Sequence, residues 1–314
     1  MRGALASSVS VMALLTGGCG GSTSSAPSSE PIGSDAKPTS EAVGPQYGSV
    51  HVYVDPSRFD DFVRSWLATF GGTAKPAGIA DVTPTTSHTR SQLVLSPVGT
   101  LSVFGFLTPA PFPFGSERTG WLLRDFDAGI QQARASGAIL QVAPFDDPIG
   151  RDAVVTFPGG VNTQLYWHTS VPNYPALQTI PDNRVYLSPD AVDAFLKSYL
   201  TFSAGTVIAD DPSADGALIG KPGSTFRQIR LSSEFGNTVV SVTDGHLPYP
   251  YGREVAGYAV DDVAATVAKA TAAGAQVLVP RRDIGGATSA VLQFPGGYVA
   301  EVHQAGCAVV MRRV

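Results

Sequence analysis

Hydrophobic and polar positions follow a recurring order along the chain. Residues 50–54 (VHVYV) alternate as in a β-strand. Apolar residues then recur at helical spacing from Phe59 to Phe70, which predicts an amphipathic helix. Two strand-like runs follow, QLVLS at 92–96 and LSVFGF at 101–106. The pattern predicts a strand, a helix and two further strands.

The same order starts again after the proline-aromatic stretch PFPFG at 111–115. The run GWLL predicts a strand, Asp125 suits the N-cap of a helix, and Gly137 suits the residue after its end. The runs AVVTF and TQLYW then predict two strands joined by the turn PGG. This stretch therefore repeats the scheme of the first.

A longer repeat divides the chain into two domains. Residues 111–160 align with 248–297 without a gap, and PYPYG takes the place of PFPFG. Identical positions include Pro111/Pro248, Glu117/Glu254, Asp125/Asp262, Gly137/Gly274 and the FPGG motifs at 157–160 and 294–297. Such self-similarity indicates a tandem duplication. The predicted domains are residues 47–168 and 182–306, with a linker at 169–181 and a tail at 307–314.

The stretches LLRDFDAGIQQARASGAIL and YAVDDVAATVAKATAAGAQVL, each followed by a strand, FPGG and a strand, resemble the vicinal oxygen chelate superfamily. That superfamily includes glyoxalase I, extradiol dioxygenases and bleomycin-resistance proteins. The resemblance implies an α+β fold of tandem glyoxalase-like domains, each with two βαβββ modules whose curved sheets form a cup. PFPFG and PYPYG would join the two modules of a domain. Alternatively, their aromatic residues (Phe112, Phe114, Tyr249, Tyr251) would line the mouth of the cup.

The N-terminus has a different character. Arg2 precedes an apolar run that ends in LTGGC, and this stretch resembles a bacterial lipobox. The resemblance implies that residues 1–19 are a lipoprotein signal peptide, that Cys19 is lipidated, and that the protein is exported and anchored to a membrane facing the periplasm or the cell exterior. An ordinary signal peptide with a chance cysteine, or a buried helix, is the alternative. Residues 20–46 are rich in Ser, Pro and Gly without a hydrophobic period, which predicts a disordered tether.

Composition narrows the function classes. A hydrophobic share of 43% and a charged share of 15% are typical of a globular protein. The 21 basic residues are outnumbered by 26 acidic ones and are scattered, which argues against nucleic-acid binding. HExxH, GxSxG, a cysteine cluster and a Gly-rich phosphate loop are all missing from the sequence. The expected partner is a small-molecule ligand, and the oligomeric state stays open.

The resemblance also implies where metal ligands would stand. Its closing-strand position falls on Gln164 and Glu301, and its position seven residues before the helix Asp falls on Arg118 and Val255, which do not bind metals. On the opening strands the candidates are Ser49 or His51, and Asp182 or Arg184. A lone histidine such as His51 is more often a hydrogen-bonded pocket residue than a ligand. We therefore expect no cofactor, and at most a weakly bound divalent metal held by Glu301 and His51.

Two functions follow from these residues. The favoured one is a binder without a tightly held metal, which takes a small oxygenated or anionic molecule in a cup. Its expected ligand-binding residues are Arg118, Gln164, Arg184, Tyr53, Tyr166 and Tyr186. The alternative is a metal-dependent enzyme of the lyase, isomerase or dioxygenase type, with Glu301 and His51 as catalytic residues.

The pairing of modules decides which candidates meet. If each domain closes on itself, His51, Arg118 and Gln164 share the first cup, and Arg184 forms an ion pair with Glu301. If modules are exchanged between domains, His51 meets Glu301, while Arg184 meets Arg118 and Gln164 in an anion pocket. The sequence analysis favours the exchanged arrangement, because a tandem fusion easily replaces a domain-swapped dimer.

Overall fold

The computed structural model describes residues 39–304. The predicted signal peptide and lipobox, Cys19, most of the predicted tether and the tail at 307–314 lie outside the described residues. Within the described part of the chain, no helix is long and apolar enough to cross a membrane.

The first domain contains two modules in chain order. The first comprises β1 (Gly48–Tyr53), α1 (Phe59–Phe70), β2 (Thr73–Ala74), β3 (Gly78–Ala80), β4 (Thr89–Ser96) and β5 (Gly99–Phe106). The second comprises β6 (Thr119–Leu122), α2 (Phe126–Ala135), β7 (Ile139–Asp147), β8 (Gly150–Phe157) and β9 (Val161–His168).

The second domain repeats this order. Its first module comprises β10 (Asp182–Leu187), α3 (Val192–Ser203), β11 (Thr206–Asp215), β12 (Thr225–Ser233) and β13 (Gly236–Val242). Its second comprises β14 (Ala256–Ala259), α4 (Val263–Ala272), β15 (Gln276–Ile284), β16 (Ala287–Gln293) and β17 (Val299–Gln304).

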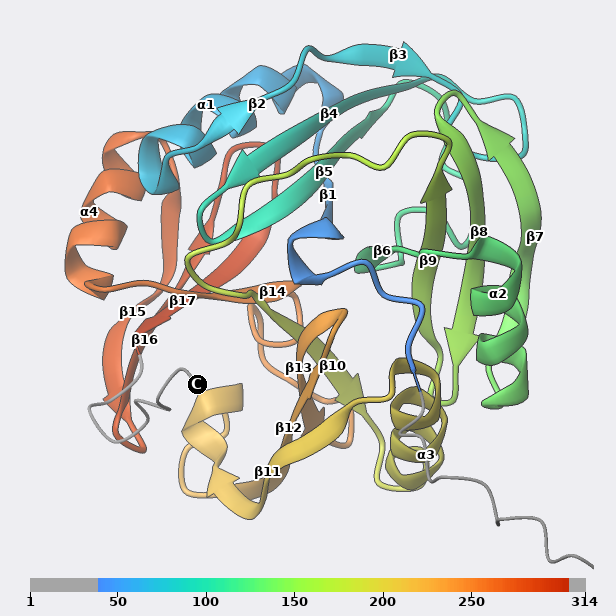
Figure 1. The fold of residues 1–314 in the computed structure, drawn as a ribbon. Helices are drawn as coiled ribbons and strands as arrows, with labels where there is room; N and C mark the ends of the chain where they lie inside the picture. Colours follow the sequence, from blue (N-terminus) through green and yellow to red (C-terminus); the bar gives the residue numbers. More distant parts are fainter. Residues whose placement is uncertain (1–38, 305–314) are drawn as a thin grey trace, which may run out of the picture. The chain divides into compact units, whose positions relative to one another are not determined.

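Each domain forms one curled mixed sheet, as Figure 1 shows. In the first, β1 runs parallel to β5 and antiparallel to β6, so the two modules join edge to edge. In the second, β10 makes the same pairings with β13 and β14. The α+β fold of tandem βαβββ modules is confirmed. The preference for exchanged modules is wrong, because both opening strands pair within their own domain.

The predicted helix signals have the expected local geometry. The Asp125 side chain accepts a hydrogen bond from the Ala128 N–H at 3.0 Å, and Asp262 does the same for Ala265 at 2.9 Å. Gly137 and Gly274 have φ of 99° and 96°, which a glycine tolerates and an L side chain resists. Both helices therefore begin and end where the repeat predicts.

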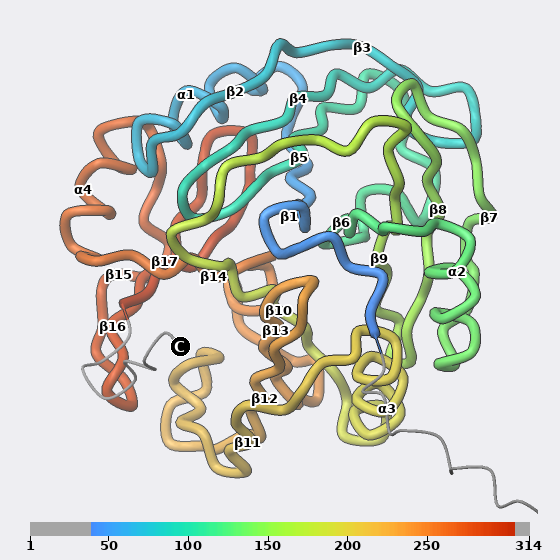
Figure 2. The backbone as a smooth tube through the Cα atoms, in the orientation of Figure 1, coloured from blue at the N-terminus to red at the C-terminus, as the bar shows by residue number. Residues whose placement is uncertain are grey.

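The first hydrophobic core is built from both domains. The rings of Phe62 and Trp66 on α1 are fully buried against the second domain. The centroid of the Trp66 ring lies 4.9 Å from that of Tyr258 and 5.1 Å from that of Phe294. Accordingly, α1 lies beside α4 in Figures 1 and 2.

The second core also crosses between the domains. Trp121 on β6 stacks on Phe235 with centroids 4.8 Å apart, and on Phe202 at 6.1 Å. Phe157 completes the contact against Tyr199 on α3. Figures 1 and 2 place α2 beside α3, opposite the α1–α4 pair. Each sheet is thus formed by one domain, whereas each of these two cores is formed by residues of both domains.

The last part of the predicted tether is folded. Ala42 is fully buried in the second core and bridges to Leu123, and residues 45–47 form a 3₁₀ turn. Residues 39–46 therefore belong to the folded body, and the boundary predicted at residue 47 comes too late for them. The sequence pattern missed this segment because it is rich in Ser and Pro and buries a single alanine, and one buried residue leaves no hydrophobic period.

The proline-aromatic stretches join β5 to β6 and β13 to β14, so their predicted linking role is confirmed. Phe112 and Tyr249 are 73% and 63% exposed. Phe114 and Tyr251 instead line cavities. The alternative reading therefore holds for Phe114, which lines the cup of the first domain, but not for Tyr251, whose cavity lies at the junction of the two domains.

Candidate ligand-binding site

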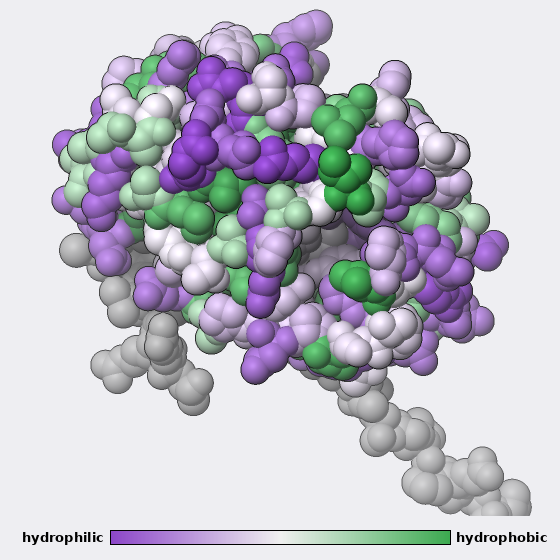
Figure 3. All heavy atoms as spheres, turned by 90° about the horizontal axis from the view of Figure 1, so that it is seen from above, coloured by the Kyte–Doolittle hydropathy of each residue, from purple (hydrophilic) through white to green (hydrophobic). Residues whose placement is uncertain are grey.

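Strand β1 supplies the centre of the first cup. Its alternation points Val50 and Val52 into the first core, while Ser49, His51 and Tyr53 face the concave side of the sheet. This side encloses a cavity of about 360 Å³. In Figure 3, the face seen from above mixes hydrophilic and hydrophobic residues and is hollowed near its centre.

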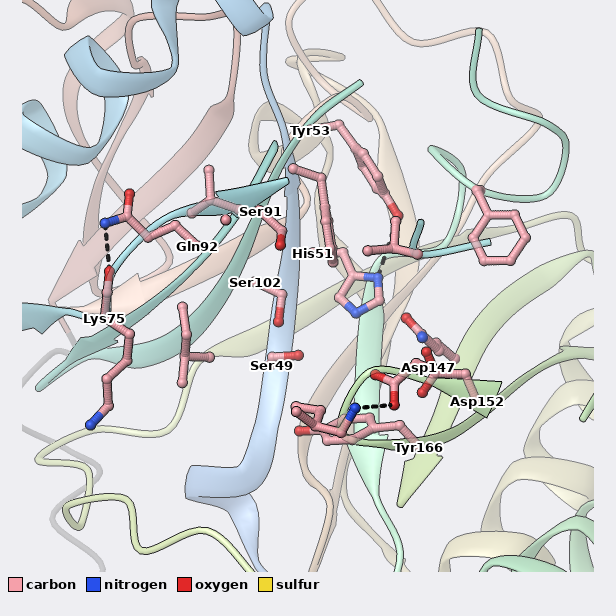
Figure 4. Close-up of a pocket in the computed structure, with 18 of the residues that line it drawn as sticks. Ser49, His51, Tyr53, Lys75, Ser91, Gln92, Ser102, Asp147, Asp152 and Tyr166 are labelled. Atoms are coloured by element: carbon pink, nitrogen blue, oxygen red, sulfur yellow. Dashed lines mark hydrogen bonds between the residues drawn. The ribbon is translucent and has the colours of Figure 1, made fainter. Parts of the chain in front are cut away.

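Acidic and basic side chains line the cavity in equal number. They are the carboxyl groups of Glu117, Asp147 and Asp152, the amine of Lys75 and the imidazoles of His51 and His168. Figure 4 shows Asp147 and Asp152 on one side of β1 and Lys75 on the other. The half of the cavity around His51 is therefore the acidic half.

A buried polar cluster forms beside His51. The Tyr53 hydroxyl donates to Oε1 of Glu117, and Nδ1 of His51 lies 3.6 Å from the same oxygen. His51 and Glu117 are only 3% and 2% exposed. Burial and the neighbouring Glu117 raise the pKa of Tyr53 well above its usual value, so its hydroxyl keeps its proton. The other carboxyl oxygen of Glu117, Oε2, has no hydrogen-bond partner among the described residues.

Asp152 and Tyr166 complete the acidic half. Burial, and then the charge of Asp147, raise the pKa of Asp152 well above its ordinary value. A hydrogen bond from Gln164 acts in the opposite direction. Tyr166 donates to the carbonyl of Tyr47 and is thereby held in place. Asp152 can therefore hold a proton and serve as a hydrogen-bond donor as well as an acceptor.

Gly120 occupies the cup-facing position between Ser49 and Gln164. The register pairs Gly120 with Ser49 on one side and with Gln164 on the other. A Cβ atom there would come within 2.5 Å of Nε2 of His51. The expectation that Arg118 stands at this level is wrong by two residues.

This geometry does not suit a metal ion. A divalent cation needs at least three converging ligands. Beside His51 the described residues offer one carboxylate, Glu117, which already accepts a hydrogen bond from Tyr53, together with an uncharged amide, a serine and a glycine. The described residues contain no group of three or more His, Cys, Asp or Glu side chains that could hold a metal.

The corresponding place in the second domain is filled by an ion pair. Arg184 donates to Oε2 of Glu301, and their side chains are 12% and 17% exposed. Gly257 leaves the space that this pair fills, since a Cβ there would lie 2.4 Å from Arg184. His303 lies 3.8 Å from Asp182 and 3.9 Å from Glu301. Burial, followed by the charge of Arg184, lowers the pKa of His303 to about 4.

The Arg118 side chain crosses from the first domain to the second. It donates to the backbone carbonyls of Glu254 and Gly252, at 2.9 and 3.4 Å. Its guanidinium lies 5.9 Å from the ring centroid of Tyr186, whose hydroxyl donates to Glu254. The Arg118 side chain therefore lies with neither the His51 nor the Arg184 side chain.

The structure thus divides the predicted site residues among three places. His51, Tyr53, Gln164 and Tyr166 line the first cup; Arg184 and Glu301 pair in the second domain; Arg118 and Tyr186 lie at the domain junction. The pairing of His51 with Glu301 as metal or catalytic partners is wrong, because they lie on different sheets.

Sequence reasoning missed Glu117 and Asp152 as site residues. Glu117 did leave a signal, since it recurs as Glu254 at the repeat spacing, and each glutamate accepts a hydrogen bond from the tyrosine of its opening strand. Asp152 left none, because Ser289 stands at its repeat position.

Comparisons with known proteins bear on the fold. No protein-family model and no curated protein sequence matches the chain. Among solved structures, a triple mutant of 4-hydroxymandelate synthase from Streptomyces coelicolor matches with a TM-score of 0.56 and 13% identity, over 85% of this chain and 94% of that one.

Two other structures match at a similar level. One is 2,2',3-trihydroxybiphenyl 1,2-dioxygenase from Sphingomonas wittichii, with a TM-score of 0.51, 12% identity and coverage of 84% and 91%. The other is the Mn(II)-bound glyoxalase from Novosphingobium aromaticivorans, with a TM-score of 0.51, 14% identity and coverage of 88% of both chains. Together with the two curled sheets of βαβββ modules, these matches show that the chain has the vicinal oxygen chelate fold in two tandem copies.

Proposed function

We propose that the protein binds a small organic molecule in the cup of its first domain without a tightly held metal. The observation that carries this proposal is the buried Oε2 of Glu117, which lines an open cavity and lacks a hydrogen-bond partner among the described residues. A buried polar atom without a partner costs about 1–3 kcal/mol, and a ligand donor would remove that cost.

The charges of the cup favour a ligand that carries an amine. The carboxyl groups of Glu117 and Asp147 line the half of the cup around His51, beside Asp152, which can hold a proton, so a ligand anion would meet repulsion there. Phe104 and Phe106 stack with Tyr53, at centroid distances of 5.5 and 6.0 Å, and give the cup an aromatic wall. Aromatic faces and carboxylates together suit an organic ammonium group. The anionic ligand expected from the sequence does not suit this cup.

A metal-dependent enzyme is the second candidate. It is favoured by the similar structures, of which one is a Mn(II)-bound glyoxalase and others are dioxygenases. Against it stand Glu301, which is engaged by Arg184, and Gly120, which supplies no ligand beside His51.

Two small molecules with the same phenyl ring and opposite charges test the amine proposal. Phenethylamine should bind the chelator-treated protein and raise its Tm, whereas phenylacetate, which has the same ring and the opposite charge, should not. Glu117→Gln should weaken phenethylamine binding about tenfold, because it removes a charge-assisted hydrogen bond worth roughly 1.5–3 kcal/mol. Isothermal titration calorimetry measures both affinities.

Asp127→Asn, which changes an exposed carboxylate outside the cup, is the matched control and should bind like the parent. Equal affinity for both probes would contradict the assignment of an amine. Recovery of binding only when Mn²⁺ or Zn²⁺ is added back would favour the enzyme instead.

We also propose that the protein is exported and anchored through a lipid on Cys19. This proposal rests on LTGGC followed by a Ser- and Pro-rich stretch. Cys19→Ala should leave the precursor uncleaved and release the protein from the membrane fraction of the host, as followed by fractionation and mass spectrometry. Membrane retention and normal processing of this variant would refute the lipobox interpretation.

A further inference from the structure

A second cavity, of about 370 Å³, lies at the junction of the two domains. Its wall combines Arg118, Ser116 and Asn162 of the first domain with Tyr186, Tyr251 and Arg253 of the second. No acidic side chain is among its described lining residues. It therefore differs in charge from the first cup, although Glu117 and Arg118 are adjacent in the chain.

The Arg118 guanidinium is half-buried and has no ion pair among the described residues. Its two hydrogen bonds go to backbone carbonyls. No carboxylate oxygen of the described residues lies within 4.0 Å of its nitrogen atoms. A guanidinium has five N–H donors, so three remain. Glu254 is the acidic residue whose charge acts on this guanidinium, and its carboxyl group accepts from the Tyr186 hydroxyl. A guanidinium that has lost much of its water is costly unless an anion pairs with it.

Further hydrogen-bond donors line the same cavity as this guanidinium. Nη1 of Arg282 donates to the Tyr251 hydroxyl at 2.7 Å, which leaves the tyrosine's own proton for another acceptor. Asn162 donates one amide hydrogen to Ser116 at 3.0 Å and keeps a second. Arg253 is exposed at the rim and adds a second positive charge.

From this geometry we propose that the junction cavity binds a small anion through Arg118, in the form of a phosphate or carboxylate group. Two parallel N–H donors of the guanidinium match two oxygen atoms of either group, and Arg253 at the rim adds a second positive charge. The site is separate from the first cup and does not depend on what that cup binds.

The test titrates the chelator-treated protein with inorganic phosphate and with succinate, against sodium chloride at equal ionic strength. Phosphate or succinate should give saturable heat and raise Tm beyond the chloride control. Arg118→Gln should weaken binding at least about tenfold, since it removes a charge-assisted bidentate contact. Arg134→Gln, on the exposed face of α2, should bind these anions like the parent.

If Arg118→Gln does not fold, two rim variants still decide. Arg253→Gln should weaken anion binding severalfold, and Asn162→Asp should weaken it further by placing a negative charge in the wall. Unchanged anion affinity in the folded variants would overturn the proposal, as would the absence of saturable binding to the folded parent. Binding of phosphate but not succinate, or the reverse, would identify which group the site takes.

Discussion

Separated at the linker, residues 39–174 and 175–304 should each fail to form a stable native structure. Each of the two hydrophobic cores takes about half of its aromatic residues from either fragment, for example Trp66 with Tyr258 and Trp121 with Phe235. Fully burying one such side chain contributes about 1.5–3 kcal/mol. Exposing several of them costs about as much as the 5–15 kcal/mol of a typical folding free energy. Near-ultraviolet circular dichroism and thermal melts of each fragment measure the effect.

The control is the whole chain with a protease site inserted at Asn173 and then cleaved. This nicked protein should keep a cooperative melt, because the cores hold the halves together without the peptide bond. Mixing the two fragments should restore part of the native signal. A sharp melt from either fragment alone would show that the domains fold independently.

Arg184→Ala should lower the free energy of unfolding by about 3 kcal/mol, at the lower end of the range for breaking a buried ion pair. The substitution leaves the Glu301 carboxylate in a place where its side chain is only 17% exposed. Replacing both partners, as in Arg184→Met with Glu301→Gln, should recover most of the loss, because no unpaired charge remains. Urea unfolding of the parent, Arg184→Met, Glu301→Gln and the double variant completes the cycle, and Arg184→Ala is measured beside them.

The matched control is Arg227→Ala. Arg227 pairs with Asp210 on the surface, where the two side chains are 34% and 38% exposed, so its loss should stay below about 1 kcal/mol. Additive effects of the Arg184 and Glu301 substitutions would mean that the observed pair contributes nothing to stability.

The elements that the sequence predicts well are those with both a strong apolar period and a punctuating residue. Helix α2 is bounded by Asp125 and Gly137, and β1 alternates against a buried core. Strand β7 was missed because it runs along an exposed sheet edge, where Ile139 is 65% exposed and apolar alternation is not required. A pattern reports burial, so an element that buries little leaves little pattern.

The candidate site was harder to predict for a different reason. His51 and Tyr53 were correctly placed on one face because a strand fixes which residues share a face, whereas the favoured exchanged arrangement wrongly separated His51 from Gln164. The direction of the Arg118 side chain depends on carbonyls 134 and 136 residues away in the sequence, at Gly252 and Glu254. No local pattern encodes such a contact. The exchanged pairing failed likewise, since two equivalent strand edges were available and the sequence does not distinguish them.

The sharing of cores between domains also has a consequence for the time course of folding. Trp66 lies near the start of the folded body, but its partners Tyr258 and Phe294 are among the last parts of the chain to be synthesised. The first core therefore cannot close while the polypeptide is still growing, and its apolar face stays accessible until synthesis is nearly complete. Contacts of such long sequence separation are slow to form. A chain built this way stays unfolded longer after the ribosome, and that interval is when chaperones and translocation machinery act on an unfolded polypeptide.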